Sequence, residues 1–182
     1  MILAIRFIGV LNAAIWLGAA VFFTFGAQGT FFSPEMKATG LHPFWPGVMA
    51  QLLIGRYFQL QCICAAVALA HLLAEWVYLG RALHKVTAGI LVGLFLMGLA
   101  GGLLLQPKMK EFHLIKYSMG PDYKPVQMPN EQRLEAAKSF SRWHGAAMSI
   151  NLVVLGCLVF YFWRVTHPPD NLRFVGAAKF RS

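Results

Sequence analysis

Apolar positions along the chain gather into four long runs, at about residues 3–25, 53–79, 86–105 and 146–163. Each run comes close to the roughly 20 residues that a helix needs to cross about 30 Å of hydrocarbon. The runs lack the alternation of barrel strands, and a backbone in lipid must satisfy its own hydrogen bonds. The pattern therefore predicts an all-α integral membrane protein, a four-transmembrane-helix bundle that forms one domain over residues 1–182.

The polar segments between the runs define the two ends of this bundle. Four spans place both termini and the turn at 80–85 on one side, called side A, and the loops 26–52 and 106–142 on the other, called side B. In the polar loop 106–142 we expect helical extensions: the third helix continues to about Gly120, and a new helix begins with Asn130 as N-cap and runs into the fourth span. Loop 26–52 is rich in aromatic residues, which predicts a segment lying at the membrane interface.

Composition narrows the class of partner. The chain is 58% hydrophobic and 13% charged, against about 25% charged residues in a soluble domain. Its net charge of +9 is not gathered into a basic helix or an aromatic-lined groove outside the spans, so we expect no nucleic acid and instead anionic lipid headgroups as partners of the bilayer-embedded protein.

Charge also bears on location. The first run is too long for the apolar part of a cleavable signal peptide, and Arg6 is its only nearby cation, so we expect it to be retained. The turn at 80–85 and the basic tail 164–182 favour cytoplasmic termini. The sequence thus predicts a multi-pass protein, in a bacterial inner membrane, with both termini in the cytoplasm.

Small residues mark where helices are expected to pack closely. Gly89 and Gly93, then Gly98 and Gly102, form two pairs spaced four apart in the third span, and Ala14 and Gly18 form a related pair in the first. Such spacing lets two transmembrane backbones approach each other. We predict contacts inside the bundle, with a homodimer face as the alternative.

Polar side chains inside the spans are the strongest functional pointers in a membrane sequence, because each costs free energy unless it is paired. We predict that six of them are buried within the bundle, namely Arg6, Asn12, Arg56, Gln59, Gln61 and Asn151.

His71 and Glu75 are four residues apart and so share one helix face. One interpretation is structural, with Glu75 paired to Arg6 or Arg81. Another is chemical, because histidine and carboxylate bind metals and relay protons; His71 is then a candidate ligand for a tetrapyrrole, and His71 with Glu75 for a metal such as copper. By helix rise, His71 and His144 lie too far apart along the membrane normal to bind one iron.

The loop on side B holds a second set of candidate copper ligands. Met109, His113, Met119 and Met128 are soft or borderline ligands for Cu(I). Their spacing has no regularity, so the pattern gives this interpretation little support.

Three short motifs occur in order along the chain: a tryptophan and glycine at 16 and 18, the segment GRYF at 55–58, and FSRWHG at 140–145. Together they resemble the DUF4149 family, the TMEM205-like four-helix membrane proteins. The resemblance implies a fold and a membrane location and no reaction. Phe140, Arg142 and His144 match the family motif. The helix that runs into the fourth span places Trp143 and His144 at the side B boundary, and Gly145 there allows a neighbouring helix to come close.

No hydrolase elbow, phosphate-binding loop, HExxH or CxxC occurs in the sequence. We therefore expect a non-catalytic accessory or structural subunit, packed with other integral membrane subunits in a larger complex. The first alternative is a haem-, tetrapyrrole- or copper-handling redox protein that uses His71 and Glu75. The second is a small transporter, which would need a polar path from the side A polar residues to Gln61, Ser149 and Asn151.

Overall fold

The computed structural model describes residues 2–80 and 84–167. The predicted basic tail is therefore described only as far as position 167. Arg81 also lies outside the described residues. The described residues form helices and loops, with one isolated β-bridge between Met119 and Pro125.

Four long helical segments make up the fold, two of which pass through a short π-helix (η). The elements in chain order are α1 (Ile2–Val21), η1 (Phe22–Ala27), α2 (Gln28–Phe31), α3 (Pro34–Ala38), α4 (Phe44–Leu79), α5 (Lys85–Ala100), η2 (Gly101–Leu105), α6 (Gln106–Lys116) and α7 (Asn130–Thr166).

Four helices are long and apolar enough to cross a membrane: they run over Leu3–Ala38, Phe44–Tyr78, Lys85–Lys116 and Asn130–Thr166. This confirms the predicted all-helical membrane fold. It also confirms the helical extensions into the polar loop, because α6 prolongs the third span and α7 includes the fourth span and the helix before it.

Local sequence explains how several helices begin and end. Gly80 ends α4 in the left-handed conformation (φ 62°), which glycine adopts without a steric penalty. The imidazole of His84 then accepts the Thr87 N–H at 3.4 Å and caps α5. Ser33 caps α3 in the same way by accepting the Met36 N–H at 3.2 Å.

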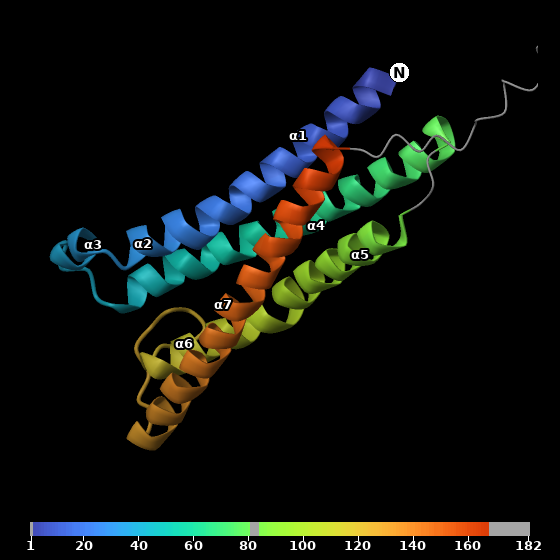
Figure 1. Cartoon of the computed structure of the whole chain (residues 1–182). Coiled ribbons are helices and arrows are strands. Elements are labelled where there is room, and N and C mark those ends of the chain that lie inside the picture. The colour runs from blue at the N-terminus through green and yellow to red at the C-terminus, as the bar shows by residue number, and fades with distance from the viewer. Residues whose placement is uncertain (1, 81–83, 168–182) are drawn as a thin grey trace, which may run out of the picture.

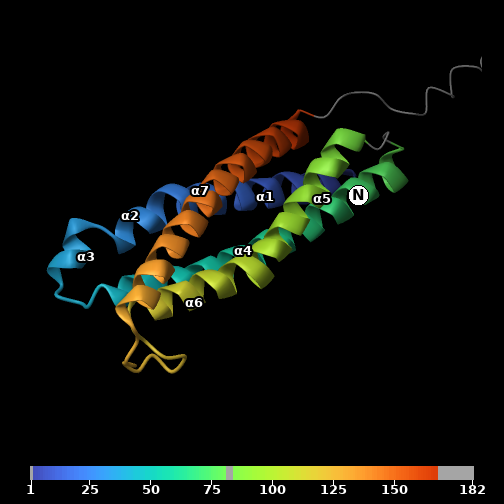
Figure 2. The ribbon, with the colours of Figure 1, turned by 90° about the horizontal axis from the view of Figure 1, so that it is seen from below.

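The long helices are arranged around α4 (Figure 1). Helix α4 lies between α1 and α5, and α7 crosses the others obliquely, packing on α6 at side B and on α1 toward side A. Figure 2 shows the same crossing from below. The N-terminal end of α1 and the C-terminal end of α7 lie at the same end of the bundle, as four spans require. Trp16, Leu91, Leu94 and Leu158 are among the most deeply buried side chains of its core.

Two boundaries differ from the prediction. Helix α4 begins at Phe44 instead of near residue 53, and together with α2 and α3 it occupies most of the segment predicted as an interfacial loop. Phe44 is completely buried, because aromatic rings from α6 and the 117–129 loop surround it. Pro129 and not Asn130 is the N-cap of α7, and its side chain makes no capping bond.

The predicted glycine contacts are half right. A methyl group on Gly98 would lie 3.1 Å from the Cys62 sulfur, and one on Gly102 would lie 3.5 Å from Phe58 Cβ, so both glycines pack on α4. A methyl group on Gly89 or Gly93 would meet no described atom within 4 Å. The same holds for Gly18, so the glycine of the pair in α1 also faces outward.

Candidate functional site

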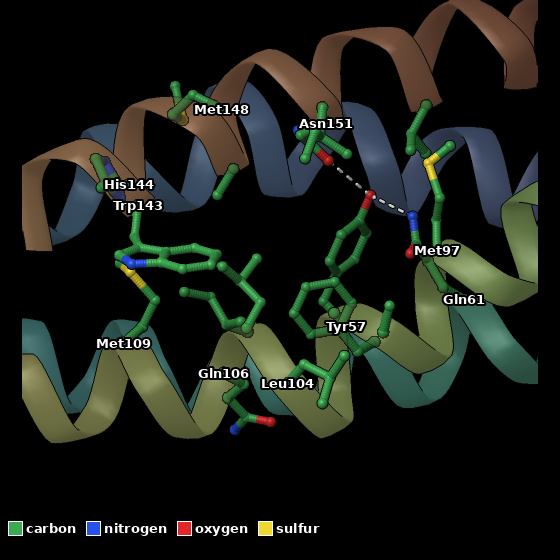
Figure 3. A pocket seen from close by; sticks show the side chains of 18 of the residues that line it. Tyr57, Gln61, Met97, Leu104, Gln106, Met109, Trp143, His144, Met148 and Asn151 are labelled. Carbon is green, nitrogen blue, oxygen red and sulfur yellow. Dashed lines mark hydrogen bonds between the residues drawn. The ribbon is translucent and has the colours of Figure 1, made fainter. Parts of the chain in front are cut away.

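A pocket of about 390 Å³ lies in the side B half of the bundle. It is enclosed by α4 and by η2 with α6, and α7 covers it (Figure 3). Helix α7 leaves a gap there because it contacts α6 and α1 and is barely in contact with α5. Most of the wall is apolar, and the residues that form it include Phe23, Ile54, Phe58, Met97, Leu104, Leu105, Met109, Met148, Ile150 and Val154.

The pocket opens on the lateral surface of the bundle. Leu104 on η2 and Ile150 on α7 line it, yet keep 68% and 51% of their surface exposed. Both residues belong to helices long and apolar enough to span the membrane. These two side chains therefore lie on the side of the pocket that faces the hydrocarbon of the bilayer.

A hydrogen-bonded network closes the inner end of the pocket. Gln61 Nε2 donates to the Tyr57 hydroxyl at 3.0 Å, and this hydroxyl donates to Asn151 Oδ1 at 3.1 Å. Asn151 Nδ2 donates to Thr24 Oγ1, and Thr24 in turn donates to the Ala20 carbonyl, each at 2.7 Å. Figure 3 shows Tyr57 reaching from α4 toward Asn151 on α7. The network links α4, α7 and η1 in a region where water cannot satisfy these groups.

Both π-helical segments that the structure describes line this pocket. Phe23 belongs to η1, and Gly101, Leu104 and Leu105 belong to η2. A π-helix occurs in well under 1% of residues, and short π segments within α-helices are frequent at functional sites. The Phe58 ring occupies the space where Gly101 has no side chain. Two rare segments on different helices thus meet at one cavity.

The outer end of the pocket lies at the side B boundary. The Trp143 ring points from α7 across the mouth toward Met109 on α6, with His144 beside it (Figure 3). Gln106 Nε2 donates to the Gln51 carbonyl at 3.4 Å and so ties α6 to α4 at this level. Trp143 keeps 43% of its surface exposed. It therefore covers the outer, side B end of the pocket without sealing it.

A cluster of aromatic rings supports this outer end. His144 stacks on Phe140, one turn earlier in α7, with ring centroids 5.9 Å apart. Phe140 meets the buried His113 of α6 at 5.8 Å, and His113 stacks on Phe44 at 5.1 Å. The Lys116 ammonium lies 5.4 Å from the centre of the Phe140 ring. Phe140 therefore packs α7 on α6, whereas Arg142, His144 and Gly145 are exposed.

The six polar residues predicted to be buried divide into two groups. Asn12 and Gln61 are buried, and Asn151 is half-buried; Asn12 Nδ2 donates to the Cys64 carbonyl at 3.0 Å. The prediction is wrong for Arg6, Arg56 and Gln59, which are exposed at the surface of the bundle. Arg56 instead donates to Gln59 at 3.1 Å on the outside of α4, where long polar side chains reach the headgroup layer.

His71 is buried toward side A, with its imidazole against Gly9 of α1. The nearest ring atom to Gly9 is Nε2, a nitrogen that would bind a metal, and it has no hydrogen-bond partner among the described residues. Helix α1 therefore occupies the space in which a flat tetrapyrrole on Nε2 would lie. Trp16 Nε1 and the Tyr161 hydroxyl are likewise buried without a partner among the described residues, although Tyr161 lies near Asn12.

Metal binding finds little geometric support in the described residues. Among the described residues, no three His, Cys, Asp or Glu side chains lie close enough together to hold a metal ion. His71 and the half-buried Glu75 therefore have no third ligand of these types beside them. Met109 and His113 are buried on α6, whereas Met119 and Met128 lie half-buried in the loop that follows.

The polar path required by a transporter is also interrupted. Gln61 and His71 lie on one helix, separated by roughly 15 Å of helix rise. Between them Ala65 and Ala68 are completely buried in the core. Ser149 donates back to the Gly145 carbonyl at 3.2 Å on the exposed face of α7. These buried alanines separate His71 from the pocket residue Gln61, whereas Asn12 bonds the Cys64 carbonyl about one turn from Gln61.

Sequence reasoning missed several residues of the pocket. Tyr57 is the centre of the network, and its spacing of four from Gln61 indicates a shared helix face. Thr24 and Met97 carry no comparable indication, because their contacts depend on how α1, α5 and α7 cross. Trp143 and His144 were predicted as boundary residues, and their place in the pocket wall was not anticipated.

Fold and pocket together define a multi-pass, all-helical membrane protein with a lateral cavity. A family model for a domain of unknown function, DUF4149, matches residues 11–118, and the chain belongs to this family. The match includes the motifs at 16–18 and 55–58 and ends before Phe140, so the TMEM205-like part of the resemblance stays a prediction. Comparisons with curated proteins and with solved structures found no match.

Proposed function

We propose that this protein is a non-catalytic membrane protein that binds a lipid-like molecule in the pocket between α4, α6 and α7. The observation that carries the proposal is a cavity of about 390 Å³ with apolar walls and a polar inner end. This volume lies within the usual range of small-molecule sites, which are mostly apolar with a few fixed polar groups.

The position of the pocket supports a ligand taken from the bilayer. Leu104 and Ile150 line the pocket and are exposed on a surface that faces hydrocarbon. Three methionines, Met97, Met109 and Met148, line the wall. Thioether side chains are flexible and adapt to irregular apolar partners, which suits a flexible chain better than a rigid polar substrate.

The chemistry of the wall supports binding and not catalysis. Tyr57 and His144 are the titratable side chains among the residues that line the pocket. The Tyr57 hydroxyl already accepts from Gln61 and donates to Asn151, and His144 stacks on Phe140. General acid–base catalysis needs a group within reach of a proton on the substrate, and no carboxylate lines this cavity.

A tryptophan placed in the cavity tests the proposal. Ala147 lines the pocket, whereas its neighbour Ala146 is exposed on another face of the same helix. The protein in lipid nanodiscs is titrated with a dansyl-labelled fatty acid, whose emission rises in an apolar site. We expect saturable binding by the wild type and by Ala146→Trp, and an at least tenfold weaker affinity for Ala147→Trp. Equal affinities in all three proteins, or no binding beyond that of empty nanodiscs, would overturn the proposal.

Outward-facing glycines support a second candidate function, that of an accessory subunit in a larger membrane complex. A methyl group on Gly18 of α1, or on Gly89 or Gly93 of α5, would meet no described atom within 4 Å, and small residues favour close helix–helix approach in membranes. Native electrophoresis in a mild detergent tests it. We expect a complex larger than the 20.2 kDa chain that dissociates in Gly93→Leu and persists in the control Val92→Leu. A chain that migrates alone in the wild type would contradict this function.

A further inference from the structure

The outer end of the pocket differs in charge from the inner end. The inner end is a neutral network of amide and hydroxyl groups on Tyr57, Gln61 and Asn151. At the outer end the imidazole of His144 stacks on Phe140, and the half-buried Lys116 places its ammonium 5.4 Å from the centre of the same Phe140 ring. The Lys116 ammonium, which also lies 5.1 Å from the Tyr117 ring, thus shares the Phe140 ring with His144, and His144 lines a cavity whose wall carries no carboxylate.

From this asymmetry we propose that the ligand is a single-chain anionic lipid, with its head beside His144 and Lys116 and its chain running inward past Trp143 and Met109 to Tyr57. This inference rests on the proposed function, since it names the class of molecule in the same pocket. A negative head at this position gains the attraction of Lys116 at the membrane boundary, where the dielectric constant is lower than in bulk water.

The dimensions of the cavity favour one chain. From His144 at the mouth to Asn151 at the inner end, α7 rises roughly 10 Å, a distance that part of an extended acyl chain can fill. A volume of about 390 Å³ lies near the lower end of the range for ligand pockets. Leu104 and Ile150 leave the side of the cavity open, so the rest of a longer chain can continue into the bilayer.

Helix α6 provides a matched pair of lysines for the test. Lys116 lies over Phe140, whereas Lys110 lies 5.5 Å from the Tyr123 ring, which packs on Phe44 and Trp45 away from the pocket wall. Both lysines thus make the same kind of cation–π contact on the same helix. Replacing either with glutamine removes one charge, and of the two only Lys116 contacts the Phe140 ring on which His144 stacks.

Two ligands separate the head from the chain. Dissociation constants are measured at pH 8.5 for palmitic acid, which carries a carboxylate, and for palmityl alcohol, which has the same chain without charge, by displacement of the dansyl-labelled fatty acid in nanodiscs. We expect the wild type to prefer the acid and Lys116→Gln to weaken acid binding about threefold or more. Lys110→Gln should bind the acid like the wild type, and all three proteins should bind the alcohol equally.

The possible failures can be told apart. If wild type and Lys116→Gln bind acid and alcohol with the same affinities, the anionic head is wrong while lipid binding in the pocket stands. If Lys110→Gln weakens acid binding as much as Lys116→Gln, the effect is one of overall charge, and the assignment of the head to His144 and Lys116 is overturned. If neither molecule displaces the probe, the proposed function fails along with this inference.

Discussion

The imidazole of His71 on α4 lies against Gly9 on α1, in the space that a methyl group on Gly9 would occupy. This contact brings two transmembrane helices together through a polar ring and a bare backbone. Close approach of helices at small residues is a general way of packing in membranes. His71, which the sequence suggests as a cofactor ligand, therefore forms part of the interface between α1 and α4.

The first prediction concerns this interface. Gly9→Ala should lower the free energy of unfolding by about 1–3 kcal/mol, the usual cost of overpacking a well-filled site, as measured by the thermal midpoint in detergent. Gly18→Ala is the matched control on the same helix, because a methyl group there would meet no described atom within 4 Å.

Removal of the ring provides an independent check of the same contact. In the double variant Gly9→Ala, His71→Ala the new methyl group has room, so its loss should be smaller than the sum of the two single losses. Strictly additive losses, or equal midpoints for Gly9→Ala and Gly18→Ala, would show that His71 and Gly9 are not in contact.

The second prediction concerns the network at the inner end of the pocket. Tyr57→Phe removes the hydroxyl that accepts from Gln61 and donates to Asn151. The amide groups of the buried Gln61 and the half-buried Asn151 then lose a partner, and we expect a loss of about 0.5–2 kcal/mol, within the range seen for hydrogen bonds inside membrane proteins. Chemical unfolding in mixed micelles measures it. Tyr78→Phe, at an exposed position on α4, should leave stability unchanged; equal effects at both positions would argue against the network.

The third prediction concerns the aromatic cluster on side B. Phe44 is completely buried and contacts His113, Tyr117 and Tyr123, so Phe44→Ala should cost about 3–5 kcal/mol. Because the cluster holds the 117–129 loop, limited proteolysis should cut this loop faster in the variant. Phe32 is exposed, and Phe32→Ala is expected to behave like the wild type in both assays. An uncut loop in Phe44→Ala would mean that other contacts hold it.

The fold followed from the sequence because its main determinant is local. A long apolar run in a bilayer forms a helix, because a helix satisfies all of its backbone hydrogen bonds internally. Sequence also located the extension of α7 from about residue 130 into the fourth span. It failed at Phe44, where an aromatic-rich segment suited an interfacial loop equally well. The start of α4 there depends on rings contributed by α6 and the 117–129 loop, which lie far away along the chain.

The candidate site could not be derived in the same way, because it depends on how helices cross. Polarity indicated Gln61 and Asn151, and their partner Tyr57 is hidden in an apolar run as one more aromatic residue. Burial depends on which side of a helix faces the bundle, which explains why Arg56 and Gln59 are exposed while Gln61, two positions further along α4, is buried. Glycine spacing likewise identified Gly98 correctly and gave no indication that Gly93 faces outward.

The last prediction concerns the arrangement of the chain across the membrane, and it uses single cysteines in a variant without Cys62, Cys64 and Cys157. His167→Cys lies at the end of α7 on side A, and Asp122→Cys lies in the loop on side B. In spheroplasts of a bacterial host, an impermeant maleimide should label Asp122→Cys at once. It should label His167→Cys only after the membrane is opened, because the basic turn and tail favour cytoplasmic termini.

A third position separates exposure to lipid from exposure to water. Ile63 keeps 61% of its surface exposed near the middle of α4, yet a cysteine there should stay unlabelled in both conditions, since a thiolate does not form in hydrocarbon. Labelling of Ile63→Cys would contradict the membrane position of α4. Labelling of Asp122→Cys and His167→Cys from the same side would contradict four spans. A reversed pattern, with His167→Cys reached first, would keep the four spans and place both termini outside the cytoplasm.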